Sequence, residues 1–306
     1  MGRSLAVEIL SYAVLGNHYH VVLFAPHELP SEQAALDGYA ELYGARRPPA
    51  TADSLDDWRR NSRDVSFFCF QLQIRFTTWF NRKRSGEKRT GTIWNGRFKS
   101  TILEGKGTNS AVWSCLKYVE LNPVRAGIVA DPADYRWSSW GSSCGSGVHP
   151  FAAAFESHLV RLKGCIADSW EPGELYRVFG AEMKRAIQAD VERQAAYDRL
   201  VALPRTKAIE VEIRKLDRDD GGDPSIWVRT DRRVRFWSDG IAIGSRRFVE
   251  ALYEKLLPDA KEKPGFASSW ASENDVDSLF SMKRKKKAPK DKAPPLPSMG
   301  ASPPGF

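Results

Sequence analysis

The chain has 306 residues, of which 46 are lysine or arginine and 38 are aspartate or glutamate, so its formal net charge is +8 and its isoelectric point is about 9.3. This length allows one or two folded domains, and a hydrophobic content of 42% is typical of a folded globular protein. The basic balance favours a polyanionic partner, whereas no apolar run approaches the roughly 20 residues of a membrane span, which excludes a transmembrane protein.

The first strands are predicted directly after the N-terminus. Residues 5–15 are rich in apolar and β-branched side chains and are predicted to form a buried strand. Gly16-Asn17 is a pair typical of turns, and residues 18–24 are predicted to return as a second strand. The polar, proline-broken residues 25–63 are predicted to be a connection with one short helix.

A long helix is predicted next. Its candidate caps are Asp64 and Ser66, and aromatic and aliphatic residues recur at helical spacing as far as about Arg84. Residues 86–96 form a basic, glycine-punctuated loop, and residues 98–104 are predicted to be a strand.

The remaining elements are mostly helical. We expect a helix over residues 109–122, capped by its first or second residue and ended by Pro123. Residues 174–203 are a long amphipathic helical region, and residues 232–257 are predicted to be a strand-like piece, a turn and a helix. The basic and proline-rich residues 283–306 are predicted to be a disordered tail.

Export and cysteine chemistry are not expected. Residues 1–10 lack a signal-peptide pattern, because charged Arg3 and Glu8 interrupt them and no small-residue cleavage site follows. The four cysteines form no Cys-x-x-Cys pair, which favours reduced, inert, buried thiols over a disulfide or a zinc site.

A pair of histidines begins the second predicted strand. Because side chains alternate across a strand, His18 and His20 share one face, while Tyr19 points to the other. Two neutral imidazoles on one face are good ligands for a divalent ion. The alternative is a pair of surface histidines on an edge strand.

A tyrosine and an asparagine lie on the helix that Pro123 ends. A core stripe of Val112, Leu116 and Val119 lies about 120° from Tyr118, at roughly 100° per residue, and Asn122 falls four residues after the tyrosine on the same face. The phenol could attack a phosphodiester and the amide oxygen could bind the metal ion. Spacing alone favours the alternative, a half-buried tyrosine followed by a helix-ending asparagine.

Four sequence blocks occur in order along the first half of the chain: GNHYHVVL, WNGRFKS, KYVELNPVRAGIV and DYRWSSW. Together they resemble the REP-associated tyrosine transposases, single-tyrosine members of the HUH (His-hydrophobic-His) nuclease superfamily. The resemblance covers roughly residues 5–141, which is under half of the chain.

The resemblance implies an α/β (α+β) fold with a ferredoxin-like antiparallel sheet, helices on one of its faces, and the histidines on a central strand. Relatives begin with one more strand and helix, so the first strand and helix of that fold are expected to be lacking here. Tyr118 matches the nucleophile that forms a 5′-phosphotyrosine link, and His18, His20 and Asn122 match the ligands of Mg²⁺ or Mn²⁺.

Contacts to DNA are expected from basic and aromatic residues around these blocks. The candidates for phosphate contact are Arg97, Lys99 and Arg125, and those for base stacking are Trp94 and Phe98. The alternative is that the WNGRF turn only anchors the fold.

The C-terminal region resembles the extra module of longer relatives. Arg246 and Arg247 lie at a predicted helix start, which suits a phosphate, although a solvated basic face is equally consistent. We therefore expect a catalytic domain over 1–145, an auxiliary, mostly helical and DNA-binding region over 150–280, and a tail over 281–306.

The expected function is that of a metal-dependent transposase that cleaves and rejoins hairpin-forming single-stranded DNA. It is expected in the cytoplasm, associated with the nucleoid and away from membranes, as a monomer or a homodimer. One alternative is a catalytically inactive, truncated remnant that still binds hairpins or single strands. Another is a relaxase-like or replication-initiator nicking enzyme, against which the WNGRFKS and YVELNPVRAG blocks argue.

Overall fold

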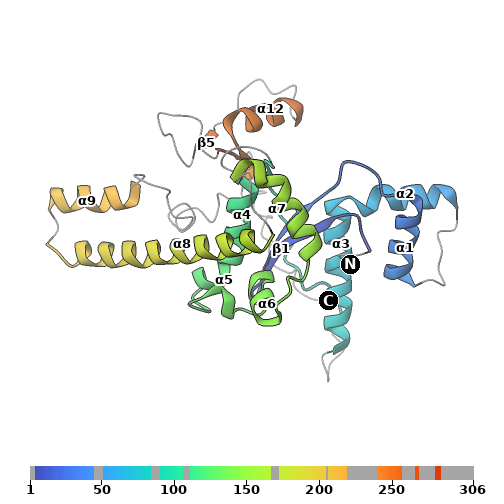
Figure 1. Cartoon of the computed structure of the whole chain (residues 1–306), viewed down its shortest axis with the longest axis horizontal. Coiled ribbons are helices and arrows are strands. Elements are labelled where there is room, and N and C mark those ends of the chain that lie inside the picture. Colours follow the sequence, from blue (N-terminus) through green and yellow to red (C-terminus); the bar gives the residue numbers. More distant parts are fainter. Residues whose placement is uncertain are drawn as a thin grey trace, which may run out of the picture.

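The computed structural model describes residues 4–44, 51–83, 90–105, 111–166, 172–204, 206–218, 240–256, 266–268 and 280–283 (Figure 1). The fold contains both helices and strands and is mostly helical, which confirms the expected mixed α/β class. Within these residues the strands form a two-stranded antiparallel sheet and a separate four-stranded sheet. The ferredoxin-like sheet therefore stays a prediction.

The predicted hairpin is confirmed. Strands β1 (Glu8–Val14) and β2 (Tyr19–Phe24) pair antiparallel, with Val14 opposite Tyr19 and Ala13 opposite His20. The Leu15 N–H donates to the carbonyl of His18 (2.8 Å), which closes the turn at Gly16-Asn17. This register fixes the position of His20 on the sheet, directly across from a buried alanine.

Two helices, rather than one short helix, follow the hairpin. Helices α1 (Glu32–Tyr43) and α2 (Ala52–Ser62) each begin at a hydroxyl cap, because Ser31 accepts from the Ala34 N–H and Thr51 from the Ser54 N–H. The prediction underestimated this segment because its helices are mostly polar and are separated by prolines.

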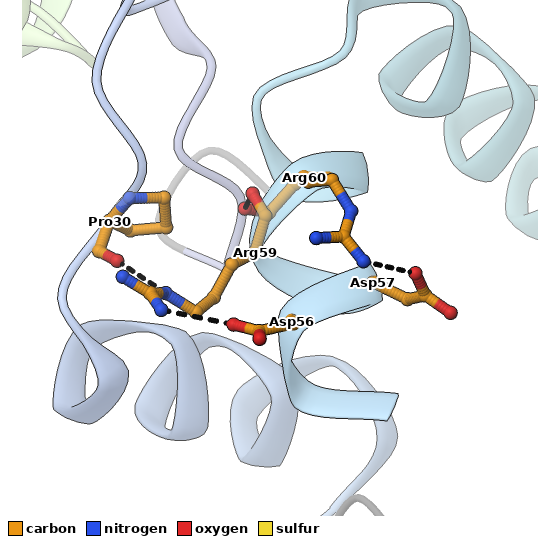
Figure 2. A network of polar contacts seen from close by, with 6 residues as sticks. Pro30, Asp56, Asp57, Arg59 and Arg60 are labelled. Atoms are coloured by element: carbon orange, nitrogen blue, oxygen red, sulfur yellow. Dashed lines mark hydrogen bonds and ion pairs between the residues drawn. The ribbon is translucent and has the colours of Figure 1, made fainter. Parts of the chain in front are cut away.

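The two helices are joined to each other and to the chain before them. The Trp58 indole on α2 donates to the carbonyl of Ala35 on α1 (2.9 Å). Figure 2 shows Arg59, whose Nε donates to the carbonyl of Pro30 (2.8 Å) while its Nη1 pairs with Asp56 (3.1 Å). The neighbouring Arg60–Asp57 pair is exposed and adds little stability. The bond from Arg59 to a backbone carbonyl is what holds α2 against the segment that precedes α1.

The long helix α3 (Val65–Lys83) matches its predicted range, and Asp64 is its cap, since its carboxylate accepts from the Phe67 N–H (2.9 Å). One face carries Phe68 and Cys69 into a small core formed with α1, α2 and the start of the chain. The opposite face leaves Phe70 and other apolar side chains exposed.

The main core lies between the hairpin and three later helices, α4 (Ala111–Glu120), α7 (Ala152–Ile166) and α8 (Pro172–Val201). Helix α4 matches the predicted helix, although residues 109 and 110 lie outside the described residues. The expectation that Pro123 ends the helical segment is wrong, because a separate short helix, α5 (Asn122–Arg125), contains that proline in its first turn. After the short helix η1 (Pro132–Asp134) come α6 (Ser139–Ser146), α7 and α8. Helices α7 and α8 add Phe155, Leu159, Phe179 and Met183 to the core that also contains Leu10, Val22 and Leu116.

This core is therefore shared by residues on both sides of the expected boundary at 145–150. Beyond the core, α8 continues outward, and α9 (Lys207–Arg218) lies at its far end (Figure 1). None of the described helices combines the length and the apolar character needed to cross a membrane.

The four-stranded sheet joins distant parts of the sequence. Strand β3 (Ile102–Leu103), shorter than predicted, pairs in parallel with β4 (Gly240–Gly244). Strand β6 (Phe280–Lys283) lies between β4 and β5 (Phe266–Ser268), and α12 (Arg246–Leu256) follows β4 as predicted. The tail was predicted to begin at residue 281, which is wrong for residues 281–283 because they belong to β6; the rest of it, from 284 onward, lies outside the described residues.

Candidate functional site

The two histidines lie side by side at the start of β2. Their ring centroids are 5.1 Å apart and the rings are nearly perpendicular, which confirms that the two side chains share one face. His18 is exposed, and its Nδ1 lies 2.7 Å from the Asn17 side-chain oxygen, whereas His20 is half-buried. The turn thus presents one imidazole to solvent and places the other beneath it.

Tyr118 lies next to the inner histidine. Helix α4 packs on both strands of the hairpin, and the Tyr118 and His20 ring centroids are 5.6 Å apart. The expectation that this tyrosine faces away from the core is wrong, because its side chain is only 3% exposed. Helix α4 is covered on more than one side: the hairpin meets the Tyr118 face, and Trp113 donates to Glu182 on α8 (3.0 Å).

Arg125 is the charged group nearest to the tyrosine. Its guanidinium carbon lies 5.1 Å from the centroid of the Tyr118 ring. Burial raises the pKa of Tyr118, and the positive charge and hydrogen bond of Arg125, with a hydrogen bond from Asn122, offset only part of that rise. The phenol is therefore protonated at neutral pH, beside a cation that would stabilise its phenolate.

The same environment keeps His20 neutral. Burial, together with the nearby His18 and Arg125, lowers the pKa of His20 to about 4. A neutral imidazole is the form that binds a metal ion, so the pair His18 and His20 fits a divalent cation by its chemistry. The depressed pKa also makes His20 a weak proton acceptor.

Asn122 is the expected third ligand. It is buried at the start of α5, and its amide nitrogen donates to the carbonyl of Tyr118 (2.8 Å), as the four-residue spacing predicts. The described residues contain no group of three or more histidine, cysteine, aspartate or glutamate side chains that could hold an ion. A metal site here would thus consist of two imidazoles and an amide oxygen.

A buried glutamate that the sequence interpretation missed holds this helix in place. Glu120 is 2% exposed, and its Oε1 accepts from the hydroxyls of Ser11 (2.6 Å) and Ser139, while its Oε2 accepts from the Trp140 N–H (3.0 Å). Burial raises the pKa of Glu120 and these hydrogen bonds oppose the rise. The available signal was a lone carboxylate between the apolar Val119 and Leu121.

Trp94 anchors the WNGRF turn to the fold, which was the alternative to base stacking. Its indole nitrogen donates to the carbonyl of Gln73 (3.0 Å) and to the Thr77 hydroxyl (2.9 Å) on α3. Its ring packs edge-on against Tyr19, at 5.7 Å between centroids. Because Tyr19 points to the opposite face of β2 from the histidines, Trp94 lies outside the Tyr118 cluster.

The other basic candidates are on the surface. Arg97 and Lys99 are exposed, and the Arg97 guanidinium lies 5.6 Å from the ring centroid of the partly buried Phe98. Their role in phosphate contact stays a prediction. Of the three basic candidates Arg97, Lys99 and Arg125, only Arg125 lies beside the Tyr118 ring.

Arg246 and Arg247 are both exposed at the start of α12, and Arg246 pairs with Glu250 (2.9 Å). The first turn of that helix already has a carboxylate, because Glu104 accepts from the Ser245 N–H (2.5 Å) and from its hydroxyl (3.0 Å). A phosphate would therefore meet these arginines through their side chains rather than through the helix N-terminus.

The cysteines take no part in the site. Burial raises the pKa of Cys69 to about 11 and that of Cys115 to about 12, which leaves both as unreactive thiols. Cys144 is exposed, contrary to the expectation that the thiols are buried, and the side chain of Cys165 lies outside the described residues.

Comparison with known proteins adds no family assignment. The chain matches no protein-family model, no curated protein and no solved structure. The function must therefore be argued from the site itself.

Proposed function

We propose that this chain is a metal-dependent transposase of the single-tyrosine HUH type, which cuts and rejoins single-stranded DNA. The observation that carries the proposal is the packing of a tyrosine ring against a histidine pair and an arginine. The Tyr118 ring lies 5.6 Å from that of His20 and 5.1 Å from the guanidinium carbon of Arg125. A nucleophile, a pair of metal ligands and a cation for the phosphate thus meet in one place.

The reaction is an exchange of one phosphodiester for another. The Tyr118 oxygen bonds to the scissile phosphorus and the bond to the 3′ oxygen breaks, which leaves a 5′-phosphotyrosine and a free 3′-hydroxyl that takes up the phenolic proton. The reverse step, with a different 3′-hydroxyl as the attacking group, joins the strands. Both steps conserve the number of phosphodiester bonds, so the energy of the cut is kept for the joining step.

Each residue of the site has a task in this exchange. Arg125 stabilises the phenolate and the phosphate charge, and the buried position of Tyr118 keeps water away from the covalent link. His18 and His20, with the amide oxygen of Asn122, would hold Mg²⁺ or Mn²⁺. Such an ion neutralises charge on the phosphate oxygens.

The proposal extends to fold, partner and location. The β1–β2 hairpin with α3 and α4 is interpreted as part of a ferredoxin-like domain. The net charge of +8 suits a hairpin-forming single-stranded DNA partner and a nucleoid-associated location.

The test is covalent capture of DNA. The full chain is incubated with Mn²⁺ and a hairpin-bearing single-stranded oligonucleotide, and the products are separated on a denaturing gel. We expect a protein–DNA adduct that disappears with Tyr118→Phe and persists with Tyr43→Phe, a matched change of a partly exposed tyrosine on α1. No adduct with the unmodified chain, or an adduct that survives Tyr118→Phe, contradicts the proposal.

The second candidate is a DNA-binding protein without catalysis. It is favoured by the 3% exposure of Tyr118 and by the raised pKa of its phenol, both of which oppose nucleophilic attack. Binding of the oligonucleotide without any adduct, at every divalent ion tried, would support this candidate over the first.

A further inference from the structure

A hollow of about 300 Å³ lies on the outer face of α3. Helix α3 forms one wall and the Thr92–Trp94 turn forms the other. The lining combines aromatic and aliphatic surface with hydroxyl and amide groups, and it includes Phe70, Gln73, Ile74, Thr77, Thr92 and Trp94. We call this feature the α3 hollow.

The wall opposite α3 is held rigidly. The Trp94 indole is fixed to α3 by its two hydrogen bonds, and the Thr92 hydroxyl accepts from the Trp94 N–H (3.1 Å). The Trp94 ring also contacts Phe76, at 5.6 Å between centroids, as well as Tyr19. A preformed wall of this kind lowers the entropic cost of binding a flat ligand.

The α3 wall is unusually apolar for a surface. The side chains of Phe70 and Ile74 are 55% and 47% exposed, one helical turn apart, with the exposed Thr78 on the next turn. A surface that offers ring faces together with hydroxyl groups suits a planar ligand with a π face and polar edges. Nucleobases have this chemistry, and stacking on aromatic side chains is how they bind without sequence-specific pairing.

The charge around the α3 hollow selects among its possible occupants. Helix α3 contains three basic residues and no acidic one, and residues 90–105 add Arg97 and Lys99 against one acidic residue, Glu104, which is hydrogen-bonded to Ser245. Arg82 and Lys83 are exposed at the C-terminal end of the helix. This field attracts a polyanion and repels a second copy of the same surface.

The α3 hollow is linked to the histidine strand through Trp94, on the face of β2 opposite the histidines. Trp94 packs on Tyr19, the residue between His18 and His20, and among the described residues β2 pairs only with β1. We propose that the α3 hollow binds an unpaired base of single-stranded DNA; that this DNA is also the strand cut at Tyr118 rests on the proposed function.

The test measures binding apart from cleavage. Fluorescence anisotropy of a labelled single-stranded oligonucleotide is recorded with the full chain carrying Tyr118→Phe, without divalent ions and at fixed salt. A series of oligonucleotides carries one abasic site at each position in turn. We expect one or two adjacent positions at which loss of the base weakens binding about tenfold, the effect of one stacked base.

Two variants on the same helix locate that base. Phe70→Ala should weaken binding of the intact oligonucleotide about tenfold. In this variant an abasic site at the sensitive position should cause no further loss of affinity. Trp79→Ala is the matched control, because Trp79 is 53% exposed on α3 but does not line the α3 hollow, and it should leave both results unchanged. Circular dichroism of both variants confirms folding, which the exposure of these side chains should preserve.

Several results would overturn the assignment. Equal losses with Phe70→Ala and Trp79→Ala would indicate general stacking along α3, and an abasic effect that persists in Phe70→Ala would place the base elsewhere. If sedimentation shows a dimer of the chain and Phe70→Ala abolishes that dimer, the α3 hollow is a contact between two copies. If the abasic pattern appears but no tyrosine adduct forms, the base site stands while the proposed catalysis fails.

Discussion

Removing the carboxylate of Glu120 should destabilise the protein severely, although this residue lies in a region that otherwise looks like an ordinary apolar core. Its side chain is enclosed between α4, β1 and the start of α6. In Glu120→Ala three buried donors lose their acceptor: the hydroxyls of Ser11 and Ser139 and the Trp140 N–H. Both serines are fully buried, so bulk solvent does not contact their hydroxyls in the native packing.

The magnitude follows from the number of donors. Each buried polar group left without a partner costs about 1–3 kcal/mol, so three donors with some relaxation amount to about 3–5 kcal/mol. Glu120→Gln should cost less, about 1–2 kcal/mol, since the amide oxygen still accepts from the Trp140 N–H and the amide nitrogen donates to one serine hydroxyl. A loss of 3–5 kcal/mol is a large share of the total stability of a typical domain.

Urea denaturation followed by tryptophan fluorescence measures these differences. Glu41→Ala is a suitable control, because Glu41 is exposed on α1, and its effect should stay within about 0.5 kcal/mol. If Glu120→Ala destabilises the protein by under 1 kcal/mol, or by less than Glu120→Gln, the carboxylate does not hold these elements together and the reasoning is refuted.

Three further changes test other parts of the structure. Burial lowers the pKa of His149 to about 4, so as the pH falls His149 takes up a proton in the unfolded chain before it does so in the folded protein. The free energy of unfolding should therefore decrease between pH 6.5 and 4, by about 2 kcal/mol at pH 5. Urea melts should show a smaller decrease for His149→Phe. Gly141→Ala should destabilise the protein by about 2 kcal/mol or more in thermal melts, because a Cβ at this position of α6 would meet the carbonyl oxygen of Tyr135. Gly145→Ala on the same helix is the control: a Cβ there would have no atom within 4 Å, so the change should be neutral or stabilising. Trp94→Phe removes two hydrogen bonds to α3 and should cost about 1–2 kcal/mol by urea denaturation; an unchanged stability would mean that the indole nitrogen does not anchor the turn.

Local patterns predicted the hairpin and the histidine pair well. The alternation of side chains along residues 18–24 was enough to place both imidazoles on one face, and the rings do lie 5.1 Å apart. The cap of α3 and its range were also predictable, because Asp64 precedes a run of apolar residues at helical spacing. In each case the information is carried by residues within one element.

Features that depend on packing between distant elements were not predictable in this way. The burial of Tyr118 depends on the hairpin that covers it, more than ninety residues earlier in the chain. The role of Glu120 requires Ser11 and Ser139 to arrive from two other segments, and neither serine has a local signature. The helical spacing around Leu116 described one core stripe correctly but could not reveal that the opposite side is covered too.

The burial of the nucleophile has a consequence for how the proposed reaction must begin. A phenol whose pKa is raised by burial is protonated and unreactive, which protects the protein from reaction with passing phosphodiesters. Arg125 offsets only part of that rise, and the depressed pKa of His20 prevents it from accepting the phenolic proton readily. Activation must therefore come with the bound DNA and its cation. Because His20 and Arg125 both adjoin the Tyr118 ring, a phosphate and a cation bound to these groups would both act on the same phenol.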